Sequence, residues 1–417
     1  MNKLESSDKI QQKTSSKVVS NLVFIFVLAI VFINVIPVIF PALMVRLVSQ
    51  YDSVINTFEF GSLAFPLLSS NVLLFGLGFL YYKKNLPNVF LKSIEFIRDF
   101  EISARTTLIV IVVLLCLFIV SNLNQLFIDE STQFPDYSQI LAPALKYWLT
   151  SKPNLGIDAT EYIHRHVEMF LLTASVTLFK NIKIIPFLAS ISLLILTYFT
   201  AAKMSKKRFA GVISMFVLLQ TYTFQRYSTI AVYDNFWILF YLLSIYVLYN
   251  KWYLSAFSYV LSIFSKLLSA PFLLMTLFFI YNSDISKDKR ILIISSYVIA
   301  VIVSILIIIF QGNIYTSFIS QKPDISMLLN GFAVWANEER FDTFLILSIL
   351  PVVIGLFFTA KRGIQEANSI LIMFAGMFLE GPVFQMINPA AMEPYRFITL
   401  VVFFAIGIGV ILSKRTR

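Results

Sequence analysis

The sequence predicts an all-α membrane protein that crosses the bilayer many times, and three observations lead to this prediction. Hydrophobic residues make up 58% of the 417 residues, and the mean hydropathy is +0.81. Charged residues make up only 13%, too few to cover the surface of a soluble domain of this length. Runs of Ile, Leu and Phe recur along the chain with charged residues between them. Lipid must therefore solvate much of the protein.

A helix needs about 20 mostly apolar residues to cross the hydrocarbon core of a membrane. By that measure the chain has about twelve candidate spans. The first is too long for the core of a signal peptide and lacks a convincing A-x-A cleavage site, so we expect a retained anchor. The least certain division lies at Lys266, which either joins two short helices or sits inside one long span. The predicted spans are 20–44, 61–82, 105–122, 184–202, 208–224, 235–250, 252–265, 267–282, 290–311, 342–360, 369–386 and 395–413.

The distribution of basic residues predicts the orientation of these spans. With the N-terminus inside, the inner segments carry about two thirds of the 33 Lys and Arg residues, and about two thirds of the 23 acids fall outside. This bias favours both termini in the cytoplasm. It also accounts for the net charge of +10, so we expect no nucleic-acid partner. The Lys-, Ile- and Asn-rich composition favours a prokaryotic cell membrane, with the endoplasmic reticulum as the alternative.

Two predicted external segments, 123–183 and 312–341, are too long to be simple turns, and loops of this length usually have a task. The string VEMFLLTASVTLFK in the first has too few apolar residues for a span, which predicts a helix along the membrane surface. The only cysteine, Cys116, lies in an apolar run, so the sequence predicts neither a disulfide nor a thiolate metal site.

An acidic pair, Asp129 and Glu130, follows the third predicted span at the external face. Adjacent side chains of an extended chain point to different sides, so one carboxylate can face a cavity while the scaffold holds the other. A carboxylate beside an apolar wall can act as a general base on a hydroxyl group, or bind a cation. The alternative is a pair of solvated loop acids.

Three further charges lie close to predicted spans. Arg226 and Asp234 flank a short external turn, FQRYSTIAVYDNFW, and Lys266 has no charged neighbour in sequence between Lys251 and Asp284. Charges this close to hydrocarbon usually face a bundle interior or an aqueous cavity. Long side chains can otherwise extend to the interface, an alternative for the arginine and the lysine. An anionic lipid phosphate is a suitable partner for Lys266.

The two histidines, His164 and His166, stand on either side of Arg165 in YIHRHVEMF. This spacing is a weak metal signal because the helix period sends the two rings to different faces, so we expect structural or substrate-contacting roles. Arg396, in MEPYRFI before the last predicted span, carries a planar guanidinium that suits phosphate.

The order of these features resembles the GT-C superfamily of membrane glycosyltransferases, particularly its protein O-mannosyltransferase and aminoarabinose transferase branch. The strings that carry the resemblance are FIDEST, FQRYSTIAVYDN and IFSKLLSAP. The resemblance covers about 105–413. It implies a catalytic transmembrane domain at 105–417, preceded at 1–104 by a cytoplasmic tail and two extra spans. The chain lacks the WWDYG-type motif of the oligosaccharyltransferase branch, and has IHRHVEMF where many relatives have a proline-rich element.

The resemblance implies transfer of a sugar from a polyprenyl- or dolichyl-phosphate-linked donor to a protein, glycan or lipid acceptor outside the membrane. Asp129 would be the base, Glu130 its neighbour in the motif and Asp234 a second acid of the cavity. The donor's phosphate would meet cations from the set Arg226, Lys266, Arg165 and Arg396, with His166 beside them. The sequence identifies no cofactor and leaves a divalent cation open, for which Asp129 and Asp234 would be the ligands. A secondary transporter or lipid flippase is the alternative, and an inactive accessory subunit is a third reading.

Overall fold

The computed structural model describes residues 2–43, 56–150, 165–283, 285–310, 325–387 and 394–413, and within these ranges every regular element is a helix. Seven of these helices are long and apolar enough to cross a membrane. Each of the seven coincides with a predicted span, so the chain is a helical membrane protein. They are α1 (Asn2–Ile39), α3 (Ala64–Tyr82), α5 (Ala104–Asn122), α8 (Ile184–Ser205), α14 (Lys287–Phe310), α17 (Thr343–Lys361) and α18 (Glu366–Ile387).

The other five predicted spans correspond to shorter helices, so a total of twelve is not confirmed. The predicted span 208–224 is divided at Thr221, whose extended backbone (φ −80°, ψ 131°) separates two helices. α11 has 13 residues and is therefore about 20 Å long, short of the roughly 30 Å of a hydrocarbon core. The shorter helices are α9 (Arg208–Leu219), α10 (Tyr222–Tyr227), α11 (Phe236–Leu248), α12 (Ser255–Ser265), α13 (Leu273–Asn282) and α19 (Ile398–Ile411).

The chain forms two compact units, each made of segments distant in sequence. The first combines Met1–Glu101, Ala201–Ala210 and Lys322–Arg417, and the second combines Ile102–Thr200 and Gly211–Gln321. The division into 1–104 and 105–417 that the resemblance implies stays a prediction.

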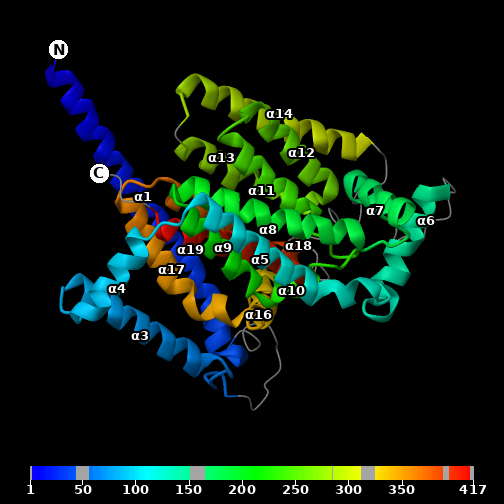
Figure 1. Cartoon of the computed structure of the whole chain (residues 1–417), viewed down its shortest axis with the longest axis horizontal. Helices are drawn as coiled ribbons and strands as arrows, with labels where there is room; N and C mark the ends of the chain where they lie inside the picture. The colour runs from blue at the N-terminus through cyan, green and yellow to red at the C-terminus, as the bar shows by residue number, and fades with distance from the viewer. Residues whose placement is uncertain are drawn as a thin grey trace. The chain divides into compact units, whose positions relative to one another are not determined.

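The core of the first unit surrounds α19, which is buried along nearly its whole length. It packs against α17 and α18, which in turn contact α1. Figure 1 shows α1, α17 and α19 together. A buried hydrogen bond of 2.9 Å from Asn368 Nδ2 to Ser20 Oγ joins α18 to α1. In α18, Gly381 allows the indole of Trp335, from α16 (Ile325–Glu339), to lie against the helix backbone, because a Cβ there would stand 2.4 Å from Trp335 Cε3.

Within the first unit, the segment after α4 (Asn88–Asp99) holds the start of α9. One oxygen of Glu101, Oε1, accepts hydrogen bonds from the N–H groups of Arg208 (3.1 Å) and Phe209 (3.3 Å). The first N–H groups of a helix have no partner within the helix, and a carboxylate there satisfies them. Lys207 is buried and donates to the carbonyl oxygen of Arg98 at 2.7 Å.

In the second unit, α11 and α12 form an antiparallel pair. Ser262 Oγ donates to the carbonyl oxygen of Trp237 at 2.7 Å, and Ser255 Oγ donates to that of Ser244 at 2.6 Å. Serine hydroxyls take part in close packing of helices in this way in membranes. Both helices lie near α14 and α13 in Figure 1, and α14 packs against α12 and α13.

α13 runs in the same direction as α11, so α12 and α13 form a hairpin. The ring of Trp237 contacts Phe272, and further along both helices the ring of Tyr249 contacts Phe279. Lys266 lies at the joint with an extended backbone (φ −157°, ψ 121°), followed by the 3-10 helix η6 (Leu267–Phe272). Of the two alternatives at Lys266, the structure has the two short helices.

The first segment, 123–183, for which the charge bias predicts an external position, contains short helices that begin directly after α5. The last of them, α7, has only 14 residues, which is too short for a membrane span. It ends at Lys180, whose backbone is in the left-handed conformation. α7 packs against both α6 and α12. The elements are η1 (Leu123–Phe127), η2 (Glu130–Thr132), the π-helical turn η3 (Tyr137–Leu141), α6 (Ala142–Thr150) and α7 (His166–Phe179).

Candidate functional site

Asp129 lies on the surface at the start of η2. Its Oδ1 accepts the backbone N–H of Ser131 at 3.0 Å, and its carbonyl oxygen accepts the hydroxyl of Thr132 at 2.7 Å. The hydrogen bond from Ser131 lowers the pKa of Asp129, aided by the nearby charge of Lys183. The carboxylate is therefore ionised at neutral pH and open to solvent.

Glu130, the next residue, has the opposite environment. It is 2% exposed, and its Oε1 accepts two backbone N–H groups, from Ala231 and Val232, each at 2.7 Å. Burial raises the pKa of Glu130 to about 7, although the N–H of Val232 and the charge of Lys183 act in the other direction. The adjacent acids thus differ in both accessibility and proton affinity.

Lys183 is the cation nearest to this acidic pair, and sequence reasoning did not single it out. Its ammonium is buried and donates to the carbonyl oxygen of Gln125 at 3.1 Å. Burial lowers the pKa of Lys183, while Glu130 and Asp129 oppose that shift. The only signal for it was a lysine directly before the apolar run 184–202, a position that is typical of an interfacial charge.

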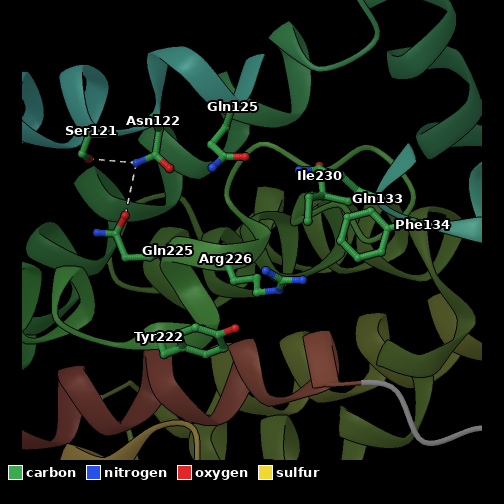
Figure 2. A pocket seen from close by; sticks show the side chains of 9 residues that line it. All are labelled: Ser121, Asn122, Gln125, Gln133, Phe134, Tyr222, Gln225, Arg226 and Ile230. Atoms are coloured by element: carbon green, nitrogen blue, oxygen red, sulfur yellow. Dashed lines mark hydrogen bonds between the residues drawn. The ribbon is translucent and has the colours of Figure 1, made fainter. Parts of the chain in front are cut away.

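A polar recess of about 290 Å³ opens beside η1 and η2. Figure 2 shows the amides of Asn122 and Gln225 on one side and the ring of Phe134 on the other, with Arg226 between them. Asn122 Nδ2 donates to Gln225 Oε1 at 3.1 Å, and the guanidinium of Arg226 lies 6.0 Å from the ring centre of Phe134. The lining residues are Ser121, Asn122, Gln125, Gln133, Phe134, Tyr222, Gln225, Arg226 and Ile230.

Arg226 is exposed in this recess and forms no ion pair with any residue that the structure describes. The side chains around it are amides, hydroxyls and two aromatic rings, all neutral. A guanidinium with no carboxylate partner favours an anion, and amides and aromatic rings suit hydroxyl-bearing rings. The recess therefore has the chemistry to bind a hydroxyl-rich molecule that carries an anionic group.

Residues 228–235, which follow Arg226, form a loop that is tied to the first external segment at several points. Besides the two bonds to Glu130, Tyr233 donates its hydroxyl to Asp136 Oδ2 at 2.7 Å. Ser228 Oγ donates to Asn122 Oδ1 at 3.0 Å. Asn122, at the end of α5, thus holds the start of this loop, and two acids of the first segment hold its middle.

Asp234, at the end of the same loop, lies in a buried charged cluster with Glu168, Arg165 and Lys266. It is 3% exposed, and its Oδ1 accepts the N–H of Phe236 at 2.9 Å. Burial raises the pKa of Asp234, although the charge of Lys266 acts in the other direction. Burial also raises the pKa of Glu168, well above its ordinary value. The charge of Asp234 also raises the pKa of Glu168, because two carboxyl groups buried in one cluster do not both ionise readily.

Glu168 is the second residue that sequence reasoning missed. It is fully buried on α7, and its Oε2 lies 3.3 Å from Nη1 of Arg165, one helical turn earlier. Nothing in VEMFLLTASVTLFK distinguished this glutamate from a solvated acid, because its partners Asp234 and Lys266 are distant in sequence.

Three predicted residues remain: His166, His164 and Arg396. The ring of His166 stands 5.5 Å from Trp148 and 5.9 Å from Phe264, and His164 lies outside the described residues. Arg396 belongs to the first unit, where its guanidinium lies over the rings of Phe384 and Tyr395. The described residues contain no group of three or more His, Cys, Asp or Glu that could hold a metal ion.

The structure therefore arranges the predicted site residues of the second unit in two groups along one loop. Arg226 lines the recess, and Asp129 and Glu130 lie in the chain between its lining residues Gln125 and Gln133, whereas Asp234, Lys266 and Arg165 form the buried cluster with Glu168. The two groups interact electrostatically, since the charge of Asp234 contributes to the raised pKa of Glu130.

No protein-family model, no curated protein and no solved structure matches the chain.

Proposed function

We propose that the protein is a glycosyltransferase of the GT-C type, which transfers a sugar from a polyprenyl-phosphate-linked donor to an acceptor outside the membrane. One observation carries the proposal. Glu130, from the acidic pair of the first segment, bonds to the loop that joins Arg226 to Asp234. Two of the strings that resemble the superfamily, FIDEST and FQRYSTIAVYDN, are thus bonded to each other beside the polar recess that contains Arg226.

In the proposed reaction an acceptor hydroxyl gives its proton to Asp129 as its oxygen attacks the anomeric carbon of the donor sugar. A bond forms between the acceptor oxygen and that carbon, the bond from the carbon to the phosphate oxygen breaks, and the configuration is inverted. The lipid phosphate leaves with the electron pair. Asp129 suits the base because its carboxylate is ionised and open to solvent. Arg226 suits the departing phosphate, whose charge develops as the bond breaks.

Lys266 and Arg165 would act on the phosphate from the buried cluster, whose carboxyl groups they also neutralise. A divalent cation shared by Asp129 and Asp234 does not fit these residues. Asp234 is buried beside two cationic side chains, which would repel a metal ion, whereas Asp129 lies on the surface. The proposed mechanism therefore assigns no step to a metal.

The test uses the full-length protein in membranes with a polyprenyl-phosphate-linked sugar, and measures release of polyprenyl phosphate. The wild type should release it without any ion gradient, and Asp129→Asn should reduce the rate at least a hundredfold. Asp288→Asn, on α14, is the matched control and should leave the rate unchanged. Full activity of correctly folded Asp129→Asn would exclude Asp129 as the base.

A secondary transporter or lipid flippase is the second candidate, favoured by the hairpin at Lys266. Discontinuous helices with a charged residue at the break, and carboxyl groups buried among helices, are typical of transporters. Uptake or flipping of a lipid-linked sugar in proteoliposomes, without release of polyprenyl phosphate, would favour this alternative.

The proposed orientation follows the charge bias of the sequence, with both termini in the cytoplasm and the first external segment outside. We further propose a prokaryotic cell membrane as the location, and about twelve membrane-inserted helices, of which five are short.

A further inference from the structure

One oxygen of Glu130 receives two consecutive backbone N–H groups from a segment about 100 residues further along the chain. Both bonds, from Ala231 and Val232, are 2.7 Å long, and the side chain is 2% exposed. Their removal would leave two buried donors without a partner, which costs more than the bonds themselves contribute.

The loop that receives these bonds has no helical hydrogen bonds of its own between Ser228 and Asp234. Its backbone conformation therefore depends on partners from other segments. Asp136, also from the first segment, accepts the hydroxyl of Tyr233. Three consecutive residues of the loop are thus held by two acids of one external segment.

The second oxygen of Glu130, Oε2, is buried and has no hydrogen-bond partner among the residues that the structure describes. It does not line the recess, whose walls include Ile230, the residue before the two donors. Neither oxygen therefore meets a substrate. Glu130 can affect the recess only through the loop that it holds.

We infer that Glu130 is a positioning residue, which sets Arg226 and Asp234 relative to Asp129 by fixing the loop between them. This inference rests on the proposed function for its catalytic meaning, but the hydrogen-bonded clamp can be tested without it. The two acids of the motif then have different tasks: Asp129 accepts the proton of the acceptor hydroxyl, and Glu130 fixes the loop 228–235.

The chain contains a matched control. Glu101 also uses one oxygen, Oε1, to accept two consecutive N–H groups about 100 residues later, those of Arg208 and Phe209, but in the first unit. Glu101 is exposed, so Glu101→Ala removes two bonds of the same pattern from the surface elsewhere in the same protein.

The first experiment is hydrogen–deuterium exchange of the full-length protein in detergent, read on peptides that cover 228–235. In Glu130→Ala these amides should exchange at least tenfold faster than in the wild type. In Glu130→Gln, whose amide oxygen can accept the same two bonds, the increase should be less than threefold. Glu101→Ala should accelerate exchange at 208–209 and leave 228–235 unchanged. Unaltered exchange of 228–235 in Glu130→Ala would overturn the inference.

The second experiment measures transfer from a polyprenyl-phosphate-linked sugar with the same variants. Glu130→Ala should lower kcat at least tenfold, Glu130→Gln should recover most of that loss, and Glu101→Ala should match the wild type. If Glu130→Gln is as inactive as Glu130→Ala while its loop stays protected, Glu130 acts on a proton and the inference is wrong.

The two proposals fail in distinguishable ways. A wild type without transferase activity rejects the proposed function, while the exchange measurement still decides whether the clamp exists. If Glu130→Ala does not fold, Glu130→Asp takes its place, because its shorter side chain keeps the charge but cannot reach both N–H groups. Exchange of 228–235 should then be at least threefold faster, and no change would overturn the inference.

Discussion

At the scale of single residues, the acidic pair shows that two adjacent carboxyl groups can differ in both solvent exposure and pKa. The backbone at Asp129 is extended, and the next residues form a 3-10 turn. The first carboxylate therefore stays in water, where a local N–H lowers its pKa, while the second enters a buried environment that raises its pKa to about 7. Their positions in the sequence alone do not reveal which of the two acids is exposed and which is buried.

The pKa of Glu130 predicts that stability falls as pH rises. The ordinary pKa of its carboxyl group is 4.5 and its pKa in the folded protein is about 7, so the folded state holds the proton more tightly. The stabilisation is complete below about pH 4.5 and lost as pH rises through 7, by about 3 kcal/mol in total. Glu130→Gln should remove this dependence, which unfolding midpoints in detergent between pH 5 and 8 would show. Parallel pH curves for both proteins would contradict the prediction.

The buried ion pair predicts a large effect of removing one partner. Glu168→Ala removes the carboxylate 3.3 Å from Arg165 and should destabilise the protein by about 3 kcal/mol or more. Replacing both partners, Arg165→Met with Glu168→Leu, should cost less than the sum of the two single changes, because no uncompensated charge remains. Denaturant unfolding of the wild type, the single variants Arg165→Met and Glu168→Leu, and the double variant gives the coupling energy, and simple additivity would argue against a coupled pair.

At the scale of helices, hydropathy identified the seven long spans because each contains an uninterrupted apolar run. It could not show that Thr221 divides the run 208–224, since threonine barely changes the mean hydropathy of a window. The charge at Lys266 did mark a break, because a lysine inside a continuous buried span would be costly. Helix ends in this protein depend on single residues, which an average over about 20 residues conceals.

The contact between α16 and α18 predicts a steric effect. Gly381→Ala would put a methyl group 2.4 Å from Trp335 Cε3, and that indole is only 1% exposed, so the helices must separate. We expect a loss of about 1–3 kcal/mol. Gly76→Ala, in α3, is the control: a Cβ there meets nothing within 4 Å, and stability should stay equal or rise by up to about 1 kcal/mol. Thermal unfolding midpoints in detergent would compare the stabilities of the two variants with the wild type. An unchanged midpoint for Gly381→Ala would show that α16 and α18 adjust to the added methyl group without loss of stability.

At the scale of the whole molecule, the orientation proposed from charge can be checked by labelling. Cys116 is the only cysteine, so Cys116→Ser gives a background without thiols. In intact cells a membrane-impermeant maleimide should label Ser131→Cys, in the first external segment, but should label Lys287→Cys only after permeabilisation. The reverse pattern would invert the topology and place the recess in the cytoplasm.

The long-range pairs explain why the site was only partly predictable. Asp129, Glu130, Asp234 and Lys266 could be selected because each is a charge beside an apolar run. The partnership of Glu168 with Asp234 could not be derived, since it depends on how α7 packs against the hairpin. Single-sequence patterns indicate which residues are costly to bury, and the fold decides which of them compensate one another.

The clamp at Glu130 also has a consequence for biosynthesis. A ribosome adds about 5–20 residues per second, so the partners Ala231 and Val232 are made roughly 5–20 s after Glu130. During that interval α8 and α9 are made while Glu130 still lacks its two partners. Nascent chains stalled before residue 230 should therefore keep this segment accessible to proteases, and closure of the clamp would mark the moment when the loop 228–235 becomes fixed.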